Sequence, residues 1–335
     1  MKRPIQLGLI GCGWVSNFYG QTVQRMSDRC AWAWAADPDE KKARAFCNQF
    51  GGKPRSSHAE AKADAYIIAT PHHLHAPQYL EIAATGAPVL IEKPLALTPE
   101  DCDRMIAARN QAGGMLMVGY VNRYRNGPRT LKAAVERGDI GQPLFGDIYQ
   151  FADQEKYIGG WLLKRETLGG GCFFSSAGHL LDLLLWFHGP VERMHVELVR
   201  YRLAMEGEDT ALATVRFRNG FLATLRESWC SNGSPYWQSY MICGTTGTLQ
   251  MTYTPRGPVP EWAQCPWDTV VTLRRDGAPE QVLLREAAPF DFKGQLEHFI
   301  ECIETGRKPL TDAESAREVI RVVREAEAAQ VKGVL

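Results

Sequence analysis

The chain has 335 residues, of which 45% are hydrophobic and 23% charged, and its 38 basic and 38 acidic residues give a formal net charge of zero. This composition is typical of a soluble globular protein, and the length favours two domains over a single core. The absence of a basic surplus argues against nucleic acid as a partner. Because no apolar run approaches the roughly 20 residues that span a bilayer, no membrane partner is expected either.

Cysteine usage indicates the redox compartment. The nine cysteines are scattered singly, without a Cys-x-x-Cys pair, which favours reduced thiols over a disulfide framework. The first residues, MKRPIQLGLIGCG, start with basic side chains but contain no long apolar stretch, so no signal peptide is expected. The predicted location is the cytoplasm.

The first part of the chain alternates apolar runs with helical patterns. The runs that predict strands are IQLGLI (5–10), AWAWAA (31–36), AYIIAT (65–70), PVLIEK (88–93) and MLMVGY (115–120). The helical pattern after the first run places Phe18, Tyr19 and Val23 on one face. Continuous apolar strands that alternate with amphipathic helices are typical of a parallel sheet covered on both faces. We therefore predict an α/β, doubly wound Rossmann sheet for this domain.

The turn after the first strand contains Gly11-Cys12-Gly13 and opens a helical pattern. In a dinucleotide-binding fold, the first glycine makes the tight turn and the second lets the backbone approach a pyrophosphate. Ser16 replaces the third glycine of the fingerprint. Asp37, at the end of the second predicted strand, stands where a carboxylate accepts the ribose hydroxyls. Because this carboxylate repels a 2′-phosphate, NAD is favoured over NADP.

Two strings follow the third and fourth predicted strands, TPHHLHAP (70–77) and IEKPLALTPED (91–101). The three histidines of the first string lack the i, i+4 spacing and the accompanying carboxylate or cysteine of a metal site, so no metal is predicted. Ligands of open α/β sheets bind outside the carboxyl ends of the strands, where both strings are expected. Pro94 restricts Lys93 to an extended backbone, which aims the ammonium at the expected nicotinamide pocket.

From about residue 121 the pattern changes to period-2 alternation. TALATVRFR and FLATLRESW flank Asn219-Gly220, which is a strong signal for a β-hairpin. Residues 241–251 and 270–286 have the same pattern and also predict hairpins. Helical patterns occupy about 126–138, 177–188, 294–305 and 312–331. These patterns predict an α+β domain with a large, mainly antiparallel open sheet. The expected domains are 1–122 for nucleotide binding and 123–335 for substrate binding and oligomerisation, with a C-terminal helix that packs back on the first domain.

These strings resemble, in their order and spacing, the glucose–fructose oxidoreductase / inositol dehydrogenase / MocA (Gfo/Idh/MocA) family of pyridine-nucleotide sugar dehydrogenases. The likeness is carried by GLIGCGWVS, AADPDEKKA, TPxxxH, EKPLALT, GYVNRYRNGPRTLKAAVERGDIGQP, GGGCFFSSAGHLLDLLLWFHG and FKGQLEHFIECIETGRKPLTDAESAREVI. The resemblance implies a Rossmann domain followed by an open-sheet α/β domain, with substrate held between them. It also implies that a lysine matching Lys93 and a histidine matching His179 form the catalytic pair.

The chain departs from the family pattern in GGGCFFSSAGHLLD (169–182), because many members carry an aspartate where this chain has Ser175. A neutral imidazole, with a pKa of about 6.5, suits the removal of a hydroxyl proton while hydride leaves the same carbon. Ser175 can form a hydrogen bond but supplies no charge. His179 is therefore predicted to be a base without its usual carboxylate neighbour, with Lys93 and Asp182 as its candidate supports. The alternative is a structural histidine that pairs with Asp182.

The expected site residues follow from the motifs and the resemblance. Those expected to contact the cofactor are Gly11, Cys12, Gly13, Trp14, Val15, Asp37, Thr70, Pro71, His72, His75, Glu92, Lys93 and Arg123. Those expected to contact the substrate are Lys93, Tyr157, Trp161, Arg165, Ser175 and His179. Tyr157 and Trp161 either stack on a sugar ring or pack in the core, and the sequence leaves both readings open.

The predicted function is NAD-dependent hydride transfer between nicotinamide and a secondary alcohol or ketone of a sugar, polyol or glycoside. Two alternatives stay open: a carbonyl or imine reductase of the same family, and a non-catalytic NAD-binding sensor. In the second domain, a sheet covered on one face would leave alternating apolar residues such as Val215 and Phe217 exposed. A large apolar face usually marks a subunit interface, and the resemblance implies a homodimer or homotetramer.

Overall fold

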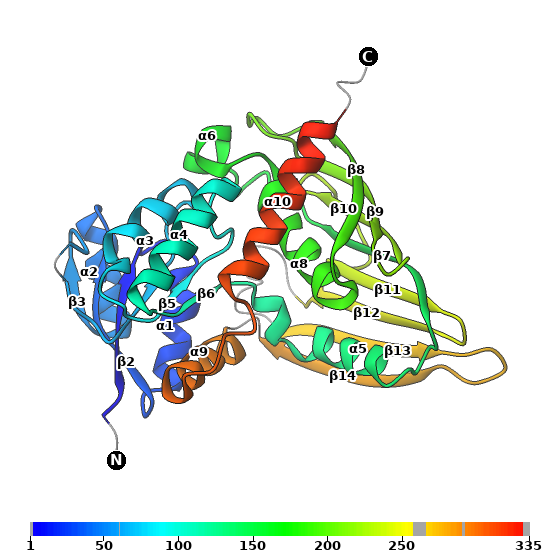
Figure 1. The fold of residues 1–335 in the computed structure, drawn as a ribbon, viewed down its shortest axis with the longest axis horizontal. Helices are drawn as coiled ribbons and strands as arrows, with labels where there is room; N and C mark the ends of the chain where they lie inside the picture. Colours follow the sequence, from blue (N-terminus) through cyan, green and yellow to red (C-terminus); the bar gives the residue numbers. More distant parts are fainter. Residues whose placement is uncertain (1–2, 60, 257–265, 290–291, 331–335) are drawn as a thin grey trace. The chain divides into compact units, whose positions relative to one another are not determined.

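The structure is a computed structural model that describes residues 3–59, 61–256, 266–289 and 292–330 (Figure 1). It divides into two compact units: unit 1 contains Met1–Val121 and Asp291–Ile320, and unit 2 contains Asn122–Phe290 and Arg321–Leu335. The domains expected from the sequence, 1–122 and 123–335, differ from these units because residues 291–320 group with unit 1.

Unit 1 is built on a six-stranded parallel sheet in the order β3-β2-β1-β4-β5-β6. Its strands are β1 (Ile5–Ile10), β2 (Cys30–Ala36), β3 (Lys53–Arg55), β4 (Ala65–Ile68), β5 (Val89–Ile91) and β6 (Leu116–Val118). The strands predicted from the apolar runs are all present. The edge strand β3 was not predicted, because its Lys-Pro-Arg sequence is exposed throughout and forms no apolar run. The order reverses between β1 and β4, as in doubly wound nucleotide-binding sheets.

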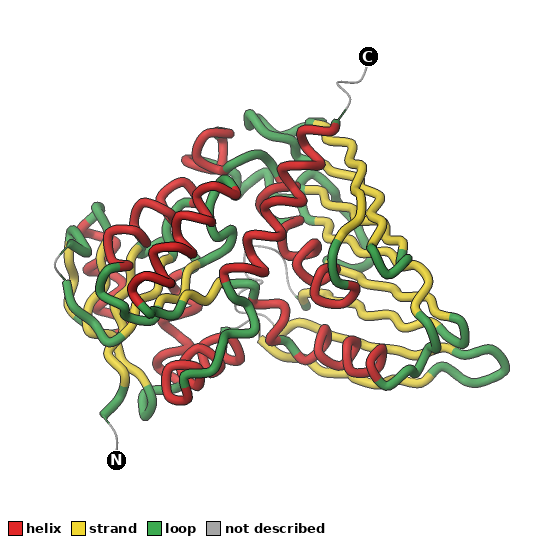
Figure 2. The backbone as a smooth tube through the Cα atoms, in the orientation of Figure 1, coloured by secondary structure: helices red, strands yellow, loops and turns green. Residues whose placement is uncertain are grey.

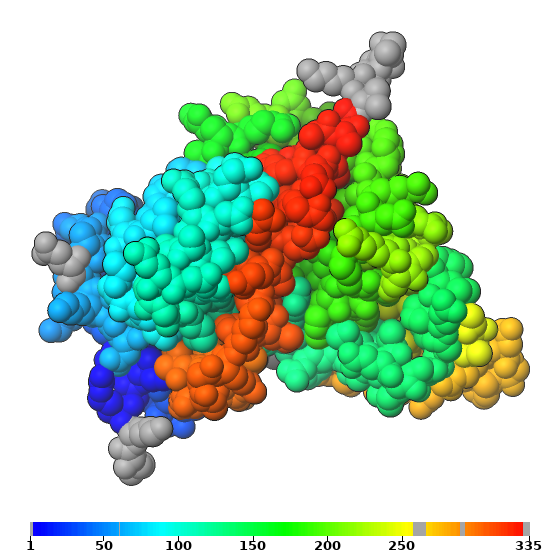
Figure 3. Space-filling view, viewed as in Figure 1, coloured from blue at the N-terminus to red at the C-terminus, as the bar shows by residue number. Residues whose placement is uncertain are grey.

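Helices connect the strands of unit 1, and two further helices come from the end of the chain. They are α1 (Ser16–Arg25), α2 (Glu40–Phe50), η1 (His72–Leu74), α3 (His75–Ala83), α4 (Pro99–Ala112), α9 (Lys293–Thr305) and the first part of α10 (Ala313–Ala329). Local sequence sets their ends: the side chains of Asp39 and Thr98 accept backbone N–H groups at the starts of α2 and α4. In the space-filling view, α9 (orange) lies beside α1 (dark blue) (Figure 3).

Unit 2 is built on an eight-stranded sheet in the order β14-β13-β12-β11-β7-β10-β9-β8. Its strands are β7 (Pro143–Phe151), β8 (Val191–Val199), β9 (Thr210–Phe217), β10 (Leu222–Ser228), β11 (Gln238–Gly244), β12 (Thr248–Pro255), β13 (Pro266–Arg274) and β14 (Gln281–Pro289). Every neighbouring pair is antiparallel except β7 and β10. The three predicted hairpins are present, whereas β7 and β8 were not predicted.

Helices cover one face of the sheet of unit 2 (Figure 2). The helices of this unit are η2 (Val121–Tyr124), α5 (Asn126–Glu136), η3 (Gly160–Leu163), α6 (Arg165–Leu168), α7 (Cys172–Ser175), α8 (Ala177–His188) and the last part of α10. The helix α5 packs on β12 and β13, while α8 packs on β7 and β10.

The prediction that Val215 and Phe217 lie on an open face is wrong, because they are 1% and 0% exposed. Both share the covered face with the other buried residues of β9. The opposite face instead carries Phe145, Leu212 and Leu222, which are 50%, 50% and 47% exposed. Alternation had revealed two faces, but the sequence did not identify which one the helices cover.

No single helix among the described residues is both long enough and apolar enough to cross a membrane. Two consecutive helical segments, Arg165–Ser175 and Ala177–His188, are together long and apolar enough, but they are bent by 49° relative to each other, and only their length and composition fit a membrane span.

Candidate functional site

The glycine loop of unit 1 has the geometry of a phosphate-binding turn. Gly11 adopts a positive φ of 95°, and a Cβ there would lie 2.6 Å from the carbonyl oxygen of Ala69. Gly13 has no atom within 4 Å of the position that its Cβ would take. The first glycine is therefore required by the turn itself, and the second leaves the space that close approach of a ligand to the backbone needs.

Asp37 follows β2 and ties this strand end to the glycine loop. Its Oδ2 accepts the N–H of Cys12 at 2.9 Å, and its Oδ1 accepts the N–H of Asp39 at 2.9 Å. The side chain is only partly buried. Each carboxylate oxygen can accept more than one hydrogen bond, so Asp37 keeps the capacity to bind ribose hydroxyls while it anchors the loop.

His75, expected at the cofactor, is fully buried at 0% exposure. Its Nδ1 lies 2.6 Å from the carbonyl oxygen of Pro94, and its Nε2 lies 2.9 Å from that of Thr70. Burial lowers the pKa of His75 to about 4, so the ring is neutral and donates to one carbonyl at a time. The ring has no exposed surface with which to touch a cofactor; it holds together the loops that follow β4 and β5.

The histidine string contains no metal site in the structure. The rings of His72 and His75 are 5.8 Å apart, and both side chains are buried. Within the described parts of the chain, no group of three or more His, Cys, Asp or Glu residues is placed to hold a metal ion.

Lys93 follows β5 and is half-buried, and its peptide bond to Pro94 is cis. The preceding Glu92, also expected at the cofactor, turns inward: its Oε1 accepts the hydroxyl of Tyr19 at 2.6 Å, and its Oε2 accepts the N–H of Lys93 at 3.2 Å. Burial raises the pKa of Glu92, while the hydrogen bond from Tyr19 and the charge of Lys93 oppose the rise. Glu92 therefore interacts with the lysine from the interior of unit 1.

The topology of unit 1 brings most of its predicted site residues to one edge. The glycine loop follows β1, Asp37 follows β2, Thr70 follows β4 and Lys93 follows β5. Since these strands are parallel neighbours, their carboxyl ends meet at the same edge of the sheet. This edge has the composition and position of a dinucleotide site.

In unit 2, the glycine run before α7 has a structural cause. A Cβ on Gly171 would lie 2.0 Å from the carbonyl oxygen of Glu208 and 2.4 Å from its nitrogen. The Glu208 carboxylate, 4% exposed, accepts the N–H groups of Gly171 and Phe173 at 3.0 Å each. Burial raises the pKa of this carboxyl group. Sequence analysis missed Glu208, because a single glutamate far along the chain carries no motif.

His179 lies in the first turn of α8 and is partly exposed, while Ser175 ends α7 and is 6% exposed. Asp182 is fully buried and accepts Nε and Nη2 of Arg123 at 2.9 and 2.6 Å. The charge of Asp182 is thus already matched, which corrects its expected role as an electrostatic support for His179. Arg123, expected at the cofactor, is 5% exposed and directs its guanidinium to Asp182.

A second buried carboxylate that sequence analysis missed lies at the start of α8. Ser176 donates to Oε1 of Glu227 at 2.7 Å and accepts the indole N–H of Trp229 at 2.6 Å. Glu227 is 0% exposed and comes from β10. In the sequence it is one polar residue near the end of an alternating strand, so nothing marked it as buried.

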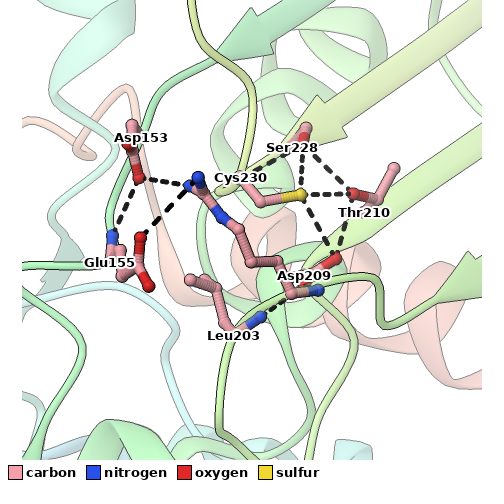
Figure 4. A network of polar contacts seen from close by, with 8 residues as sticks. Asp153, Glu155, Leu203, Asp209, Thr210, Ser228 and Cys230 are labelled. Atoms are coloured by element: carbon pink, nitrogen blue, oxygen red, sulfur yellow. Dashed lines mark hydrogen bonds and ion pairs between the residues drawn. The ribbon is translucent and has the colours of Figure 1, made fainter.

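Asp153 and Glu155, which precede Tyr157 and Trp161 in the chain, are tied to another loop of unit 2 (Figure 4). Arg202 reaches Asp153 at 2.6 Å and Glu155 at 3.6 Å. Asp209, fully buried, accepts the N–H groups of Tyr201, Arg202 and Leu203. Burial alone would raise the pKa of Asp209, but these N–H groups outweigh it and lower the pKa.

Tyr157 and Trp161 are partly exposed, and Arg165 is exposed. The guanidinium of Arg165 lies 3.8 Å from the carboxylate of Glu208. The two aromatic residues therefore have surface available for a ligand, rather than being fully buried in the core.

The sheet order of unit 1 and its glycine loop define a dinucleotide-binding protein of the Rossmann class. Residues 5–120 match the family description "Oxidoreductase family, NAD-binding Rossmann fold", and residues 129–250 match "GFO/IDH/MocA C-terminal domain". The chain belongs to the Gfo/Idh/MocA family. The family, the α/β fold class, the NAD cofactor and the oxidoreductase class predicted from the sequence are confirmed.

Individual relatives share moderate identity over most of their length. The chain is 28% identical to a putative UDP-kanosamine synthase oxidoreductase subunit of Amycolatopsis mediterranei, over 75% of each chain. It is 26% identical to 1,5-anhydro-D-fructose reductase of Ensifer adhaerens, over 80% of each. Its fold matches the WlbA dehydrogenase of Bordetella pertussis, solved with NADH and UDP-GlcNAcA, with a TM-score of 0.81, 26% identity and 98% coverage of both chains.

Proposed function

We propose that this protein is an NAD-dependent dehydrogenase that transfers hydride between nicotinamide and a secondary alcohol or ketone of a sugar, polyol or glycoside. The observation that carries the proposal is the strand-end edge of unit 1, where the glycine loop, Asp37 and Lys93 follow neighbouring parallel strands. The names of the relatives support the substrate class, since they include a 1,5-anhydro-D-fructose reductase and a myo-inositol 2-dehydrogenase.

For the cofactor, we propose that the Gly11–Gly13 loop binds the pyrophosphate and that Asp37 binds the adenosine ribose hydroxyls. The free space at Gly13 and the remaining acceptor capacity of Asp37 fit these two groups. NAD, when bound, supplies the hydride acceptor at its nicotinamide ring.

For the chemical step, we propose Lys93 and His179 as the catalytic pair. The Lys93 ammonium donates a hydrogen bond to the reacting hydroxyl oxygen and stabilises its growing negative charge. The hydroxyl proton passes to the neutral imidazole of His179 as the C–H hydride leaves, so the alcohol becomes a ketone. Ser175 acts as a neutral neighbour of His179, because its hydroxyl supplies no charge.

The reverse direction is the second candidate function. A relative named as a reductase favours reduction of a carbonyl by NADH, which would use the same residues with His179 as proton donor. The direction of turnover with each nicotinamide form distinguishes the two functions.

For the substrate, we propose that Tyr157 and Trp161 stack on a sugar ring and that Arg165 meets an acidic group. The exposed surface of these three side chains supports this assignment, and so do the ion pairs that hold Asp153 and Glu155 just before them in the chain. The test is an NAD-reduction screen across polyols, aldoses, uronates, glycosides and nucleotide sugars, with NADH oxidation by the matching ketones run in parallel. A complete lack of turnover across the screen in both directions would contradict the proposal.

We further propose a cytoplasmic homodimer or homotetramer whose partners are small molecules rather than nucleic acid or membranes. Support for assembly comes from the open sheet face, where Tyr149 and Phe151 stack at 4.6 Å and Phe145 and Leu212 are exposed. Every cysteine among the described residues is free, which suits a reducing compartment. Sedimentation that detects only particles of 37.4 kDa would contradict the oligomer.

A further inference from the structure

A chain of buried hydrogen bonds runs through unit 1 and ends at the backbone of Lys93. Nε2 of Gln295, on α9, donates to the hydroxyl of Tyr19, on α1, at 2.9 Å. Tyr19 donates to Oε1 of Glu92 at 2.6 Å, and the N–H of Lys93 donates to Oε2 at 3.2 Å. Gln295 and Tyr19 are both 0% exposed, and Glu92 is 8% exposed. Two helices far apart in the sequence thus converge on the residue before the lysine.

The chemistry of the groups sets the direction of this chain. An amide NH₂ group only donates, and a tyrosine hydroxyl carries a single proton. Once Tyr19 accepts from Gln295, its own proton remains for the carboxylate of Glu92. Phe292 holds the tyrosine ring with an edge contact at 4.9 Å between ring centroids. Glu92 therefore receives hydrogen bonds on both oxygens, an arrangement that favours its ionised form.

Electrostatics links this carboxylate to the lysine. Burial raises the pKa of Glu92, while the Tyr19 hydrogen bond and the positive charge of Lys93 oppose the rise. Attraction between opposite charges is mutual, so an ionised Glu92 also favours the charged form of the Lys93 side chain. Among the described residues, the titratable groups that act on Glu92 are Tyr19 from α1 and Lys93 on its own loop. On the other side of this loop, His75 of α3 adds no charge, because burial keeps it neutral.

We propose that Tyr19 and Gln295 are positioning residues for Lys93, which act by keeping Glu92 as a buried anion that holds the Lys93 backbone and attracts its positive charge. The proposal rests on the proposed catalytic role of Lys93. When the Tyr19 hydroxyl is removed, burial favours the neutral form of Glu92, and Lys93 loses the attraction of this carboxylate. The lysine then releases its proton at lower pH, and a neutral amine no longer stabilises the negative charge on the reacting oxygen.

The first test is the pH profile of Tyr19→Phe, which keeps the ring and removes only the hydroxyl. We expect the high-pH limb of kcat to move down by about one pH unit, with KM for NAD unchanged. Gln295→Leu should cause a smaller shift in the same direction, because the Tyr19 hydroxyl remains but is no longer oriented.

The matched control is Tyr66→Phe. Tyr66 is a buried tyrosine of the same unit, 3% exposed, whose hydroxyl contacts the carbonyl oxygen of Ala61 at 3.4 Å rather than Glu92. This variant loses the same atom from the same kind of environment and should keep the wild-type pH profile. If Tyr66→Phe shifts the limb as far as Tyr19→Phe does, the effect is general loss of stability and the proposal is overturned.

The second test needs no substrate. Lysine amines labelled by reductive methylation with ¹³C-formaldehyde report their pKa values by NMR, and the Lys93 signal is assigned by its loss in Lys93→Arg. The pKa of Lys93 should be lower in Tyr19→Phe than in the wild type or Tyr66→Phe. If Tyr19→Phe fails to fold, Gln295→Leu provides the same comparison.

The two tests separate the inference from the proposed function. An unchanged Lys93 pKa in folded Tyr19→Phe or Gln295→Leu overturns the inference, even if Lys93→Met abolishes turnover. A lowered Lys93 pKa supports the charge coupling. If Lys93→Met also turned over substrate normally, the proposed function would fail while the coupling stood.

Discussion

The two units hold their site residues in different ways. In unit 1, the carboxylates bonded directly to the site backbone lie close in sequence or on the adjacent strand: Asp37 accepts the N–H of Cys12, and Glu92 accepts that of Lys93. In unit 2, the segment before His179 is held from a distance, since Glu208 is 35 residues beyond the N–H of Phe173 that it accepts. A strand-turn-helix edge can therefore be recognised from a local motif, whereas the surroundings of α7 and α8 depend on contacts distant in sequence.

The strongest test of this comparison removes one proposed catalytic group from each unit. Lys93→Met and His179→Ala should each lower kcat by at least about 100-fold, in the range typical of lost acid–base or electrostatic catalysis. NADH binding, measured by fluorescence titration, should stay nearly unchanged. Lys53→Met, at an exposed position of β3, is the control. If His179→Ala kept the wild-type kcat and pH profile, His179 would be structural, and Lys93 itself would be the first candidate base.

The long-range support of unit 2 can be broken at Gly171. Gly171→Ala places a methyl group against the backbone of Glu208 and should lower the free energy of unfolding by about 3 kcal/mol. The matched control is Gly178→Ala in α8, where a Cβ meets no atom within 4 Å and alanine favours the helix. Urea denaturation measures both variants. If Gly171→Ala and Gly178→Ala had equal urea midpoints, close contact between residue 171 and Glu208 would not be important for stability.

Both units bury a neutral histidine, and this similarity predicts acid sensitivity. Burial lowers the pKa of His75 to about 4 and that of His188 to about 3. Unfolded imidazoles titrate at about 6.5, so below that pH the unfolded chain binds protons that the folded chain does not. The free energy of unfolding should therefore fall as pH drops from about 6.5 towards 4, by about 1.4 kcal/mol per pH unit for each histidine.

Urea midpoints across this pH range measure the effect. His188→Phe should reduce the slope of the free energy of unfolding against pH, because residue 188 then binds no proton in the unfolded chain. His195→Phe changes a side chain that is 61% exposed and should leave the slope unchanged. If the free energy of unfolding depended on pH equally in His188→Phe and in the wild type, burial of neutral His188 would not be a cause of acid sensitivity.

The local anchoring of unit 1 predicts cofactor choice. The wild type should bind NADH more tightly than NADPH. Asp37→Ala should lower the affinity for NADH about tenfold and should reduce the difference in affinity between NADH and NADPH. Fluorescence titration with both nucleotides measures this. Asp39→Ala removes the neighbouring helix cap and should affect stability without changing the preference. Equal or tighter binding of NADPH by the wild type would exclude the role of Asp37.

The smallest expected effects come from Ser175. Ser175→Asp adds a negative charge that favours protonated His179, so the low-pH limb of kcat/KM should move upward. Ser175→Ala deletes one neutral hydrogen bond worth about 1 kcal/mol and should do less. If the two variants gave identical pH profiles, position 175 would have no electrostatic influence on His179.

Most elements of the fold were predictable because their signals are local. The apolar runs of β1, β2, β4, β5 and β6, the Asn219-Gly220 turn and the four long helical patterns are encoded by residues adjacent in the chain. β7 escaped prediction, although it is central to its sheet. Its covered face includes Gly146 and the buried Gln150, so its alternation is not simply apolar and polar. The exposed strand β3 was missed because packing places it at an edge, while its composition resembles a loop.

By itself, the sequence determined the nucleotide-binding edge, because a glycine turn, an acidic residue at a strand end and a Lys-Pro pair are each recognisable from residues adjacent in the chain. Tertiary structure decided the partners of the buried charges. Asp182 pairs with Arg123, 59 residues away, and Tyr19 reaches Glu92, 73 residues away. A buried charge needs a partner wherever the fold can supply one, and spacing along the chain does not reveal which group the packing brings there.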